Sequence, residues 1–198
     1  MNSIDIFPWN ENFNTEVAEI DEQHKKLVRL LNLLAGHVTF QADLPALDAI
    51  FDELSDYAAY HFRTEEVLWN QYLPEDWLEV QHKKDHEEFA AALLRFKQEQ
   101  AAKTENVVLE KVLSFLARCL AGHILESDRY LAHVVLAMRS GLTLEAAKLQ
   151  AGEKMSGSAR VLIDIILAVY ESLSVNTLRL MRELSQHKRD DEFLRKLL

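Results

Sequence analysis

The sequence predicts an all-α protein, an up-down-up-down four-helix bundle followed by a two-helix C-terminal extension. Apolar residues recur every three or four positions along the 198 residues, and no segment sustains the alternation of period two that marks a strand. Only five glycines and three prolines interrupt this pattern, which favours long helices. With 48% hydrophobic residues, the chain has enough apolar material for one sizeable core.

An irregular N-terminal arm precedes the bundle. It spans residues 1 to about 16, and we expect its aromatic residues to fold back onto the helices: Phe7, Trp9 and Phe13. A first helix is predicted over residues 17–38. Asp43 is the predicted N-cap of a second helix, which has Pro45 in its first turn and ends near Gln71.

The third and fourth helices follow after short connections. Pro74 predicts the start of the third helix, which continues to about Ala101. A start signal at Thr104 opens the fourth, which ends near Arg139 with Gly141 just beyond it. Four helices with short connections predict an antiparallel bundle over residues 1–139.

Residues 140–198 form the predicted extension, with a short helix opening at Thr143, a break at 155–159 and a long final helix. Spacings of four and three along that helix form a heptad-like seam: Leu162, Ile166, Val169, Leu173, Asn176 and Leu180. One interpretation is that the seam covers its own bundle. We expect instead that it forms a homodimer.

Charge and composition argue against several classes of partner. Acidic residues outnumber basic ones by 32 to 22, and no basic cluster stands apart from acids, so we expect no nucleic-acid surface. The longest run without Asp, Glu, Lys or Arg is LLNLLAGHVTFQA, well short of the roughly 20 apolar residues that cross a bilayer. The N-terminus lacks the pattern of a secretory signal, and Cys119 is the single cysteine. We therefore expect a cytoplasmic protein.

Histidines and carboxylates occur at related positions on all four predicted bundle helices. In order along the chain they are His24, His61, Glu65, His82, His86, His123 and Asp128. Residues four apart lie on one face of a helix, so the pairs on the second and third helices each converge. The pair on the fourth helix is spaced by five, which is about 140° of rotation in an ideal α-helix. This pair requires either a different reach by Asp128 or a local π-helical distortion.

Burying five imidazoles and two carboxylates without a cation would be costly, so the set predicts a metal site. The number of donors exceeds what one tetrahedral zinc takes, and no cysteine lies within the motifs, which favours two metals. The third helix reads HKKDH and lacks the glutamate of the HExxH zinc-protease motif. Ferritin-like oxidases use mostly glutamates, whereas imidazole dominates here and favours binding oxygen over activating it.

The motifs IDEQH, HFRTE, HKKDH and HILESD, in this order, resemble those of the hemerythrin family in its bacterial form. The resemblance covers residues 1 to about 138. It implies two iron ions joined by a bridging oxo or hydroxo group, with Glu65 and Asp128 also bridging. One iron would take His82, His86 and His123. The other would take His24 and His61 and would offer the open position for O2, with NO as a further candidate ligand.

The resemblance also implies an apolar oxygen pocket formed by Phe62, Leu120 and Ile124. Cys119 adjoins this pocket where the family often has tryptophan, so we expect a looser pocket. Glu16 stands where the family usually has glycine before the first helix, so the entry loop could run differently. Asp21 lies three residues before His24 and is interpreted equally as a partner of a ligand histidine or as a surface acid.

Bacterial members of the family also occur as sensory inputs joined to signalling outputs. By this resemblance we expect an oxygen or redox sensor domain, with an output such as a diguanylate cyclase beyond residue 198 and the last helix carrying the signal. The alternative is a stand-alone oxygen carrier or storage protein. A di-iron enzyme is the least favoured class, and we expect no catalytic activity within these residues.

Overall fold

The computed structural model describes residues 7–40, 47–102 and 106–156. From residue 157 onward, a stretch called the last segment below, it also describes residues 160, 163–164, 166–167, 176, 179–180, 183–184, 186–187, 190 and 194–195. Every regular element in these ranges is helical, so the predicted all-α class is confirmed. None of the helices within the ranges combines the length and the apolar character needed to span a bilayer.

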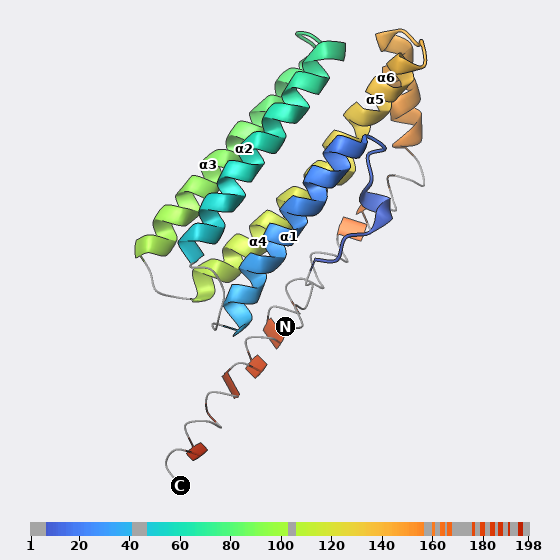
Figure 1. Cartoon of the computed structure of the whole chain (residues 1–198). Coiled ribbons are helices and arrows are strands. Elements are labelled where there is room, and N and C mark those ends of the chain that lie inside the picture. The colour runs from blue at the N-terminus through green and yellow to red at the C-terminus, as the bar shows by residue number, and fades with distance from the viewer. Residues whose placement is uncertain are drawn as a thin grey trace.

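Four helical rods form the bundle (Figure 1). The first three are α1 (Ala18–Phe40), α2 (Leu47–Tyr72) and α3 (Trp77–Ala102). The fourth consists of α4 (Asn106–Gly122), the π-helical segment η2 (His123–Asp128) and α5 (Arg129–Arg139), which follow one another without a break. The predicted caps Asp43 and Thr104 lie outside the described residues.

Each rod is apolar on both sides of a short polar stretch. One core cluster, which includes Leu34, Phe51 and Leu113, fills one part of the bundle. A second, which includes Trp69 and Val135, fills another. In every rod the predicted ligands lie between residues of the first cluster and residues of the second along the sequence. The fold therefore encloses the polar side chains between two apolar layers.

The start of α3 differs from the prediction. Pro74 lies in the turn that follows α2, and the helix begins at Trp77. Asp76 provides the helix start, because its Oδ1 accepts a hydrogen bond of 3.0 Å from the Leu78 N–H. Glu75 in this turn has a φ of 60°.

The N-terminal arm packs on the bundle as predicted and includes the short 3-10 helix η1 (Glu11–Phe13). Phe7 is fully buried, and its N–H donates to Asn32 Oδ1 at 2.8 Å while Asn32 Nδ2 donates to the Phe7 carbonyl. Just before α1, Glu16 adopts a left-handed conformation with a φ of 69°. The loop therefore keeps a backbone shape that glycine favours, although glycine is absent.

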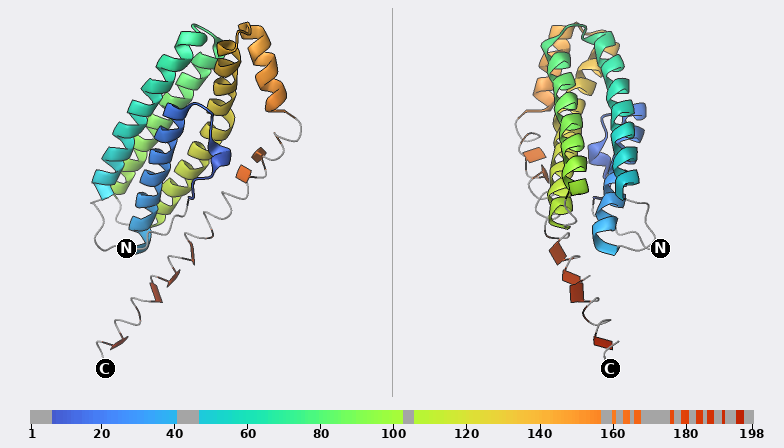
Figure 2. Two further views of the ribbon diagram at one scale, coloured as in Figure 1. Left: turned by 45° about the vertical axis from the view of Figure 1, so that its right-hand side comes forward. Right: turned by 90° about the vertical axis from the view of Figure 1, so that its left-hand side faces the viewer.

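The extension begins with α6 (Leu144–Lys154), which packs against α5 (Figure 1). Thr143 caps α6 by accepting from the Ala146 N–H, and Gly141 turns the chain with a φ of 100°. In the last segment the described residues are helical, and Ile163 is buried in a third cluster with Phe13 and Ile124. The arm and the beginning of this segment lie on the same side of the bundle (Figure 2).

The predicted dimer seam is described only in part. Leu162, Val169 and Leu173 lie outside the described residues. Ile166 packs against the third cluster of its own bundle, whereas Asn176 and Leu180 are exposed.

Candidate metal centre

The structure brings all seven predicted ligands together in the polar layer of the bundle. His24 comes from α1, two residues each come from α2 and α3, and His123 and Asp128 come from η2. Six of the seven are buried, and the side chain of His123 is 15% exposed. The helices thus converge on a site with almost no contact with solvent.

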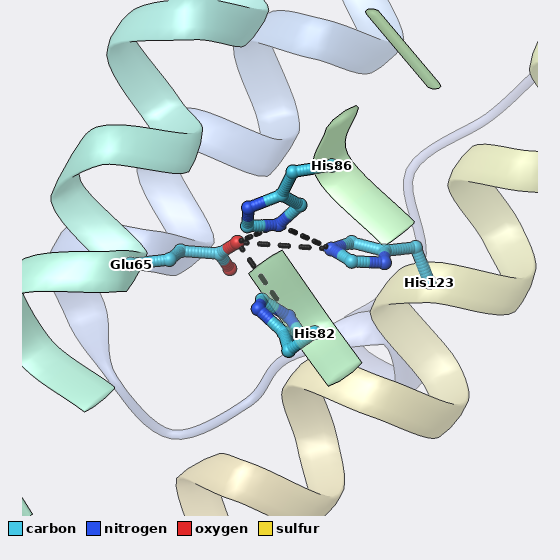
Figure 3. A group of neighbouring side chains, drawn as sticks. All are labelled: Glu65, His82, His86 and His123. Carbon is cyan, nitrogen blue, oxygen red and sulfur yellow. Dashed lines mark hydrogen bonds and ion pairs between the residues drawn. The ribbon is translucent and has the colours of Figure 1, made fainter. Parts of the chain in front are cut away.

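The donors form two groups that share Glu65. One consists of Glu65, His82, His86 and His123, and the other of His24, His61, Glu65 and Asp128. Within each group, one donor atom of every residue lies within 4.8 Å of the others. Figure 3 shows the first group, with the three imidazole rings around the Glu65 carboxylate. The arrangement therefore offers one set of donors on each side of the shared Glu65 carboxylate, which is enough for two cations.

Both carboxylates contact rings of both groups. Glu65 Oε2 lies 3.1 Å from His86 Nε2, and Glu65 Oε1 lies 3.7 Å from His24 Nε2. Asp128 Oδ1 lies 2.7 Å from His82 Nε2, and its Oδ2 lies 3.1 Å from His24 Nε2. Each carboxylate is therefore placed to bridge two metal ions.

The π-helical turn of η2 explains the spacing of five on the fourth rod. The Arg129 N–H reaches back to the Ile124 carbonyl, five residues earlier, as a π-helix requires. The wider turn brings His123 and Asp128 to one face, with 3.1 Å between His123 Nε2 and Asp128 Oδ1. Of the two alternatives that the sequence left open, the π-helical distortion is the one observed.

Several polar atoms of the centre are buried without a hydrogen-bond partner among the described residues. They are both nitrogens of His24, His61 Nε2, both oxygens of Glu65 and Asp128 Oδ2. Unsatisfied buried polar atoms cost roughly 1–3 kcal/mol each, more when charged. A pair of cations would satisfy the inward-facing atoms of this set, His24 Nε2, His61 Nε2 and the carboxylate oxygens, since imidazole nitrogens and carboxylate oxygens are ligands of divalent iron and its neighbours. The donor set therefore fits a two-iron centre.

The charged side chains of the centre shift one another's pKa values. Burial alone would lower the pKa of His24, but Asp128 and Glu65 outweigh it and raise the pKa to about 9. The same carboxylates raise the pKa of His123 against its burial. Burial prevails at His61 and lowers its pKa to about 4. The surrounding histidines hold the carboxyl pKa values of Glu65 and Asp128 well below their usual range, although burial opposes this.

Two residues that the sequence analysis missed hold the outer nitrogens of ligand rings. Gln23 Oε1 lies 3.0 Å from His61 Nδ1, and Glu66 Oε1 lies 3.2 Å from His86 Nδ1. Such contacts fix the tautomer and orientation of a ligand ring. Both residues directly adjoin a ligand in sequence, His24 and Glu65, which is the only sequence signal that points to them.

Asp21 has a different role from either that was expected. It is buried rather than a surface acid, and its Oδ1 accepts hydrogen bonds from the Thr15 N–H at 2.6 Å and from the Thr15 hydroxyl at 2.9 Å. Asp21 therefore links the N-terminal arm to α1 through Thr15.

A cavity of about 370 Å³ lies beside the centre, mainly between α3 and the fourth rod. Three of the four residues predicted for the oxygen pocket line it, Phe62, Cys119 and Leu120, together with His86 and His123. Ile124 does not line it, because its side chain packs in the third cluster with Phe13. The cavity borders ligands of the three-histidine group, whereas the resemblance placed the open position at His24 and His61. The ring of Phe62 stacks on that of His86, with 3.9 Å between centroids.

Comparisons with known proteins agree with this geometry. The family described as "Hemerythrin HHE cation binding domain" matches residues 15–134. The chain is 27% identical to a bacteriohemerythrin of Clostridium acetobutylicum over 129 residues, 63% of this chain and 97% of the relative. It is 31% identical to a bacteriohemerythrin of Pseudomonas paraeruginosa over 121 residues, 61% and 75% of the two chains. It is 30% identical to a hemerythrin-like protein of Naegleria gruberi over 122 residues, 62% and 87%.

Proposed function

Because this chain belongs to the hemerythrin family of non-haem iron, oxygen-binding proteins, we propose that it holds two iron ions and acts as an oxygen or redox sensor. The observation that carries the two-iron assignment is the set of seven converging donors with orphaned buried atoms. Three histidines, His82, His86 and His123, would hold one iron. His24 and His61 would hold the other, and Glu65 and Asp128 would join the two.

The bound metal pair would supply the electrons for oxygen binding, and the residues of this chain would control access and orientation. Phe62 and Leu120 give the neighbouring cavity an apolar wall, which limits the entry of water. Gln23 and Glu66 hold two ligand rings by their outer nitrogens. We propose a binding role and no catalytic one for these residues.

The sensor role is supported by a contact between η2, the segment that carries His123 and Asp128, and the last helical segment. Arg160 Nη2 lies 2.9 Å from Glu126 Oε1, and Glu126 lies in η2 between the ligands His123 and Asp128. Ile163 is buried beside Ala121, Ile124 and Leu125 on the same rod. A change in the centre that moves η2 would therefore shift the last segment, which could pass a signal to an output such as a diguanylate cyclase.

The alternative, a stand-alone oxygen carrier or store, differs in the lifetime of the oxygenated form. The test is an absorption time course after air is admitted to reduced, iron-loaded protein, with iron quantified on the same sample. Rapid conversion to a stable oxidised spectrum supports the sensor. An oxygen-dependent band that persists and disappears under vacuum supports the carrier. Iron far below two per chain overturns the shared site, and the same experiment with NO tests the second candidate ligand.

We further propose a homodimer through the last segment. Leu180 and Leu184 are 54% and 68% exposed and lie four residues apart on one helix, so they form an apolar strip of the kind that a partner helix covers. Leu180→Asp should yield a monomer by light scattering while iron content is unchanged. Arg179→Asp introduces the same residue one position earlier, off the seam, and should leave the mass unchanged. An equal mass for wild type and Leu180→Asp would contradict the dimer.

A further inference from the structure

We propose that Glu66 is a positioning residue that makes the two halves of the metal centre electronically unequal, lowering the reduction potential on the His86 side while the neutral Gln23 leaves the His61 side higher. This inference rests on the proposed function, because it requires iron in the centre. It assigns a role to two contacts that lie outside the ligand set.

The two contacts are geometrically alike. His61 and His86 each turn Nε2 inward, 3.5 Å and 3.1 Å from Glu65 Oε2. Each turns Nδ1 outward to a side-chain oxygen, Gln23 Oε1 at 3.0 Å and Glu66 Oε1 at 3.2 Å. The centre therefore has one ring held by an amide and one held by a carboxylate.

The hydrogen-bond network fixes the direction of the Gln23 contact. Thr64 donates its hydroxyl proton to the Tyr60 carbonyl at 3.1 Å, so Thr64 Oγ1 accepts from Gln23 Nε2 at 3.3 Å. The amide oxygen of Gln23 is thus the atom that faces His61, and the ring donates its Nδ1–H to it. This leaves His61 Nε2 unprotonated and able to bind a metal.

At His86 the acceptor carries a charge. A carboxylate has no proton to donate, so the ring donates Nδ1–H to Glu66. A charge-assisted hydrogen bond of this kind is stronger than one to an amide and makes the imidazole a more basic ligand. A more basic ligand stabilises the more highly charged metal ion, so we expect Glu66 to favour the oxidised state at the iron of His86.

The surroundings of Glu66 permit a clean test. Its side chain is 29% exposed and lines a groove of about 410 Å³ between α2 and α3, together with Arg63, Glu87 and Lys97. Glu66→Gln keeps an oxygen acceptor of the same shape and removes only the charge. Glu87 lines the same groove, is exposed, and makes no hydrogen bond or ion pair with a described residue. Glu87→Gln is therefore the matched control.

The experiment is redox titration of the iron-loaded full chain, followed by its absorption spectrum. Glu66→Gln should lower the preference for the oxidised state about tenfold, a rise of about 59 mV for a one-electron step. Glu87→Gln should shift the potential much less, and Gln23→Glu should shift it in the opposite direction. Equal shifts for Glu66→Gln and Glu87→Gln would overturn the proposal. If wild type holds no iron pair, the proposed function fails instead.

A second readout applies if Glu66→Gln holds iron poorly. The zinc-loaded chain has no redox chemistry, and NMR of its His86 ring reports the Nδ1–H directly. In wild type this proton should resonate further downfield than in Glu66→Gln, with Glu87→Gln like wild type. An identical Nδ1–H shift in all three proteins would overturn the charge-assisted contact.

Discussion

His123 Nε2 and Asp128 Oδ1 lie 3.1 Å apart although their positions differ by five, because the helix widens to a π-helical turn between them. In a continuous α-helix the two side chains would point about 140° apart. The extra residue in this turn is therefore what completes the ligand set on the fourth rod.

Moving the carboxylate by one position tests this relationship. In the double variant Ser127→Asp, Asp128→Ser, the carboxylate moves to a residue that lines the neighbouring cavity. We expect less than the wild-type iron content per chain, measured by metal analysis after reconstitution. An α-helical turn would instead place residue 127 on the face of His123, so undiminished iron would contradict the π-helical account.

Glu65 should matter more for metal content than any single histidine. It belongs to both donor groups, whereas His86 belongs to one. Glu65→Ala should therefore impair both metal positions, and His86→Ala should impair mainly one. Iron per chain distinguishes the two variants, with circular dichroism to establish that each stays helical. Equal losses in both variants would contradict the division into two groups.

The parts of the fold that the sequence predicted correctly depend on local rules. Apolar spacing defined the helices, and the flanking apolar positions placed the histidines within the bundle. Pro74 was misassigned because proline suits both a first helical turn and a connecting turn, and Asp76 supplies the helix start instead. Pro74 and Asp76 are both acceptable start signals for α3, and the sequence does not show which of them the folded protein uses.

The convergence of the seven candidate ligands was predictable because their spacing is a property of single helices. The outer contacts of Gln23 and Glu66 join residues 38 and 20 positions apart on different helices, so no local pattern reveals them. The same reason explains Ile124, whose sequence position beside His123 suggested the pocket while its side chain packs with Phe13. The direction in which such a side chain points depends on which residues of other helices pack against it, and spacing along one helix does not identify those residues.

The metal-free protein should lose stability as the pH rises from about 6.5 to about 9. Asp128 and Glu65 overcome the effect of burial and raise the folded pKa of His24 from 6.5 to about 9. A raised pKa stabilises the fold below the unfolded value, and this contribution disappears as pH rises through the folded value. The loss is on the order of 3 kcal/mol, at about 1.4 kcal/mol per pKa unit.

His123 adds to this loss in the same direction. The lowered pKa values of Glu65, Asp128 and His61 act at the acidic side instead, where their contributions are lost as pH falls. Urea unfolding of metal-free protein at pH 6.5 and 9 measures the effect. Zinc-loaded protein is the control, because bound histidines are already deprotonated, and it should show no loss in this interval. A metal-free free energy of unfolding that is flat across the interval would contradict the charged His24.

Glu16→Gly should stabilise the fold. Glu16 has a φ of 69°, a left-handed conformation that costs a residue with a Cβ roughly 1–2 kcal/mol. Glycine removes this cost and adds some entropy to the unfolded chain, so we expect a net gain of about 1 kcal/mol in the free energy of unfolding. Glu16→Ala keeps the Cβ and is the control. If both variants unfold at the same denaturant concentration, the backbone is not the cause.

Cys119→Trp should slow the conversion of the oxygenated protein to its oxidised state. Cys119 lines the cavity of about 370 Å³ that borders His86 and His123. An indole there would occupy space now open to water beside the ligands, and excluding water protects a bound ligand from displacement. Cys119→Ala also removes the thiol but leaves the space open, so it should convert at least as fast as wild type. Stopped-flow absorption after mixing with oxygenated buffer gives the rates, and thermal unfolding shows whether the larger side chain fits. Equal rates for the Trp and Ala variants would mean that another route admits water to the centre.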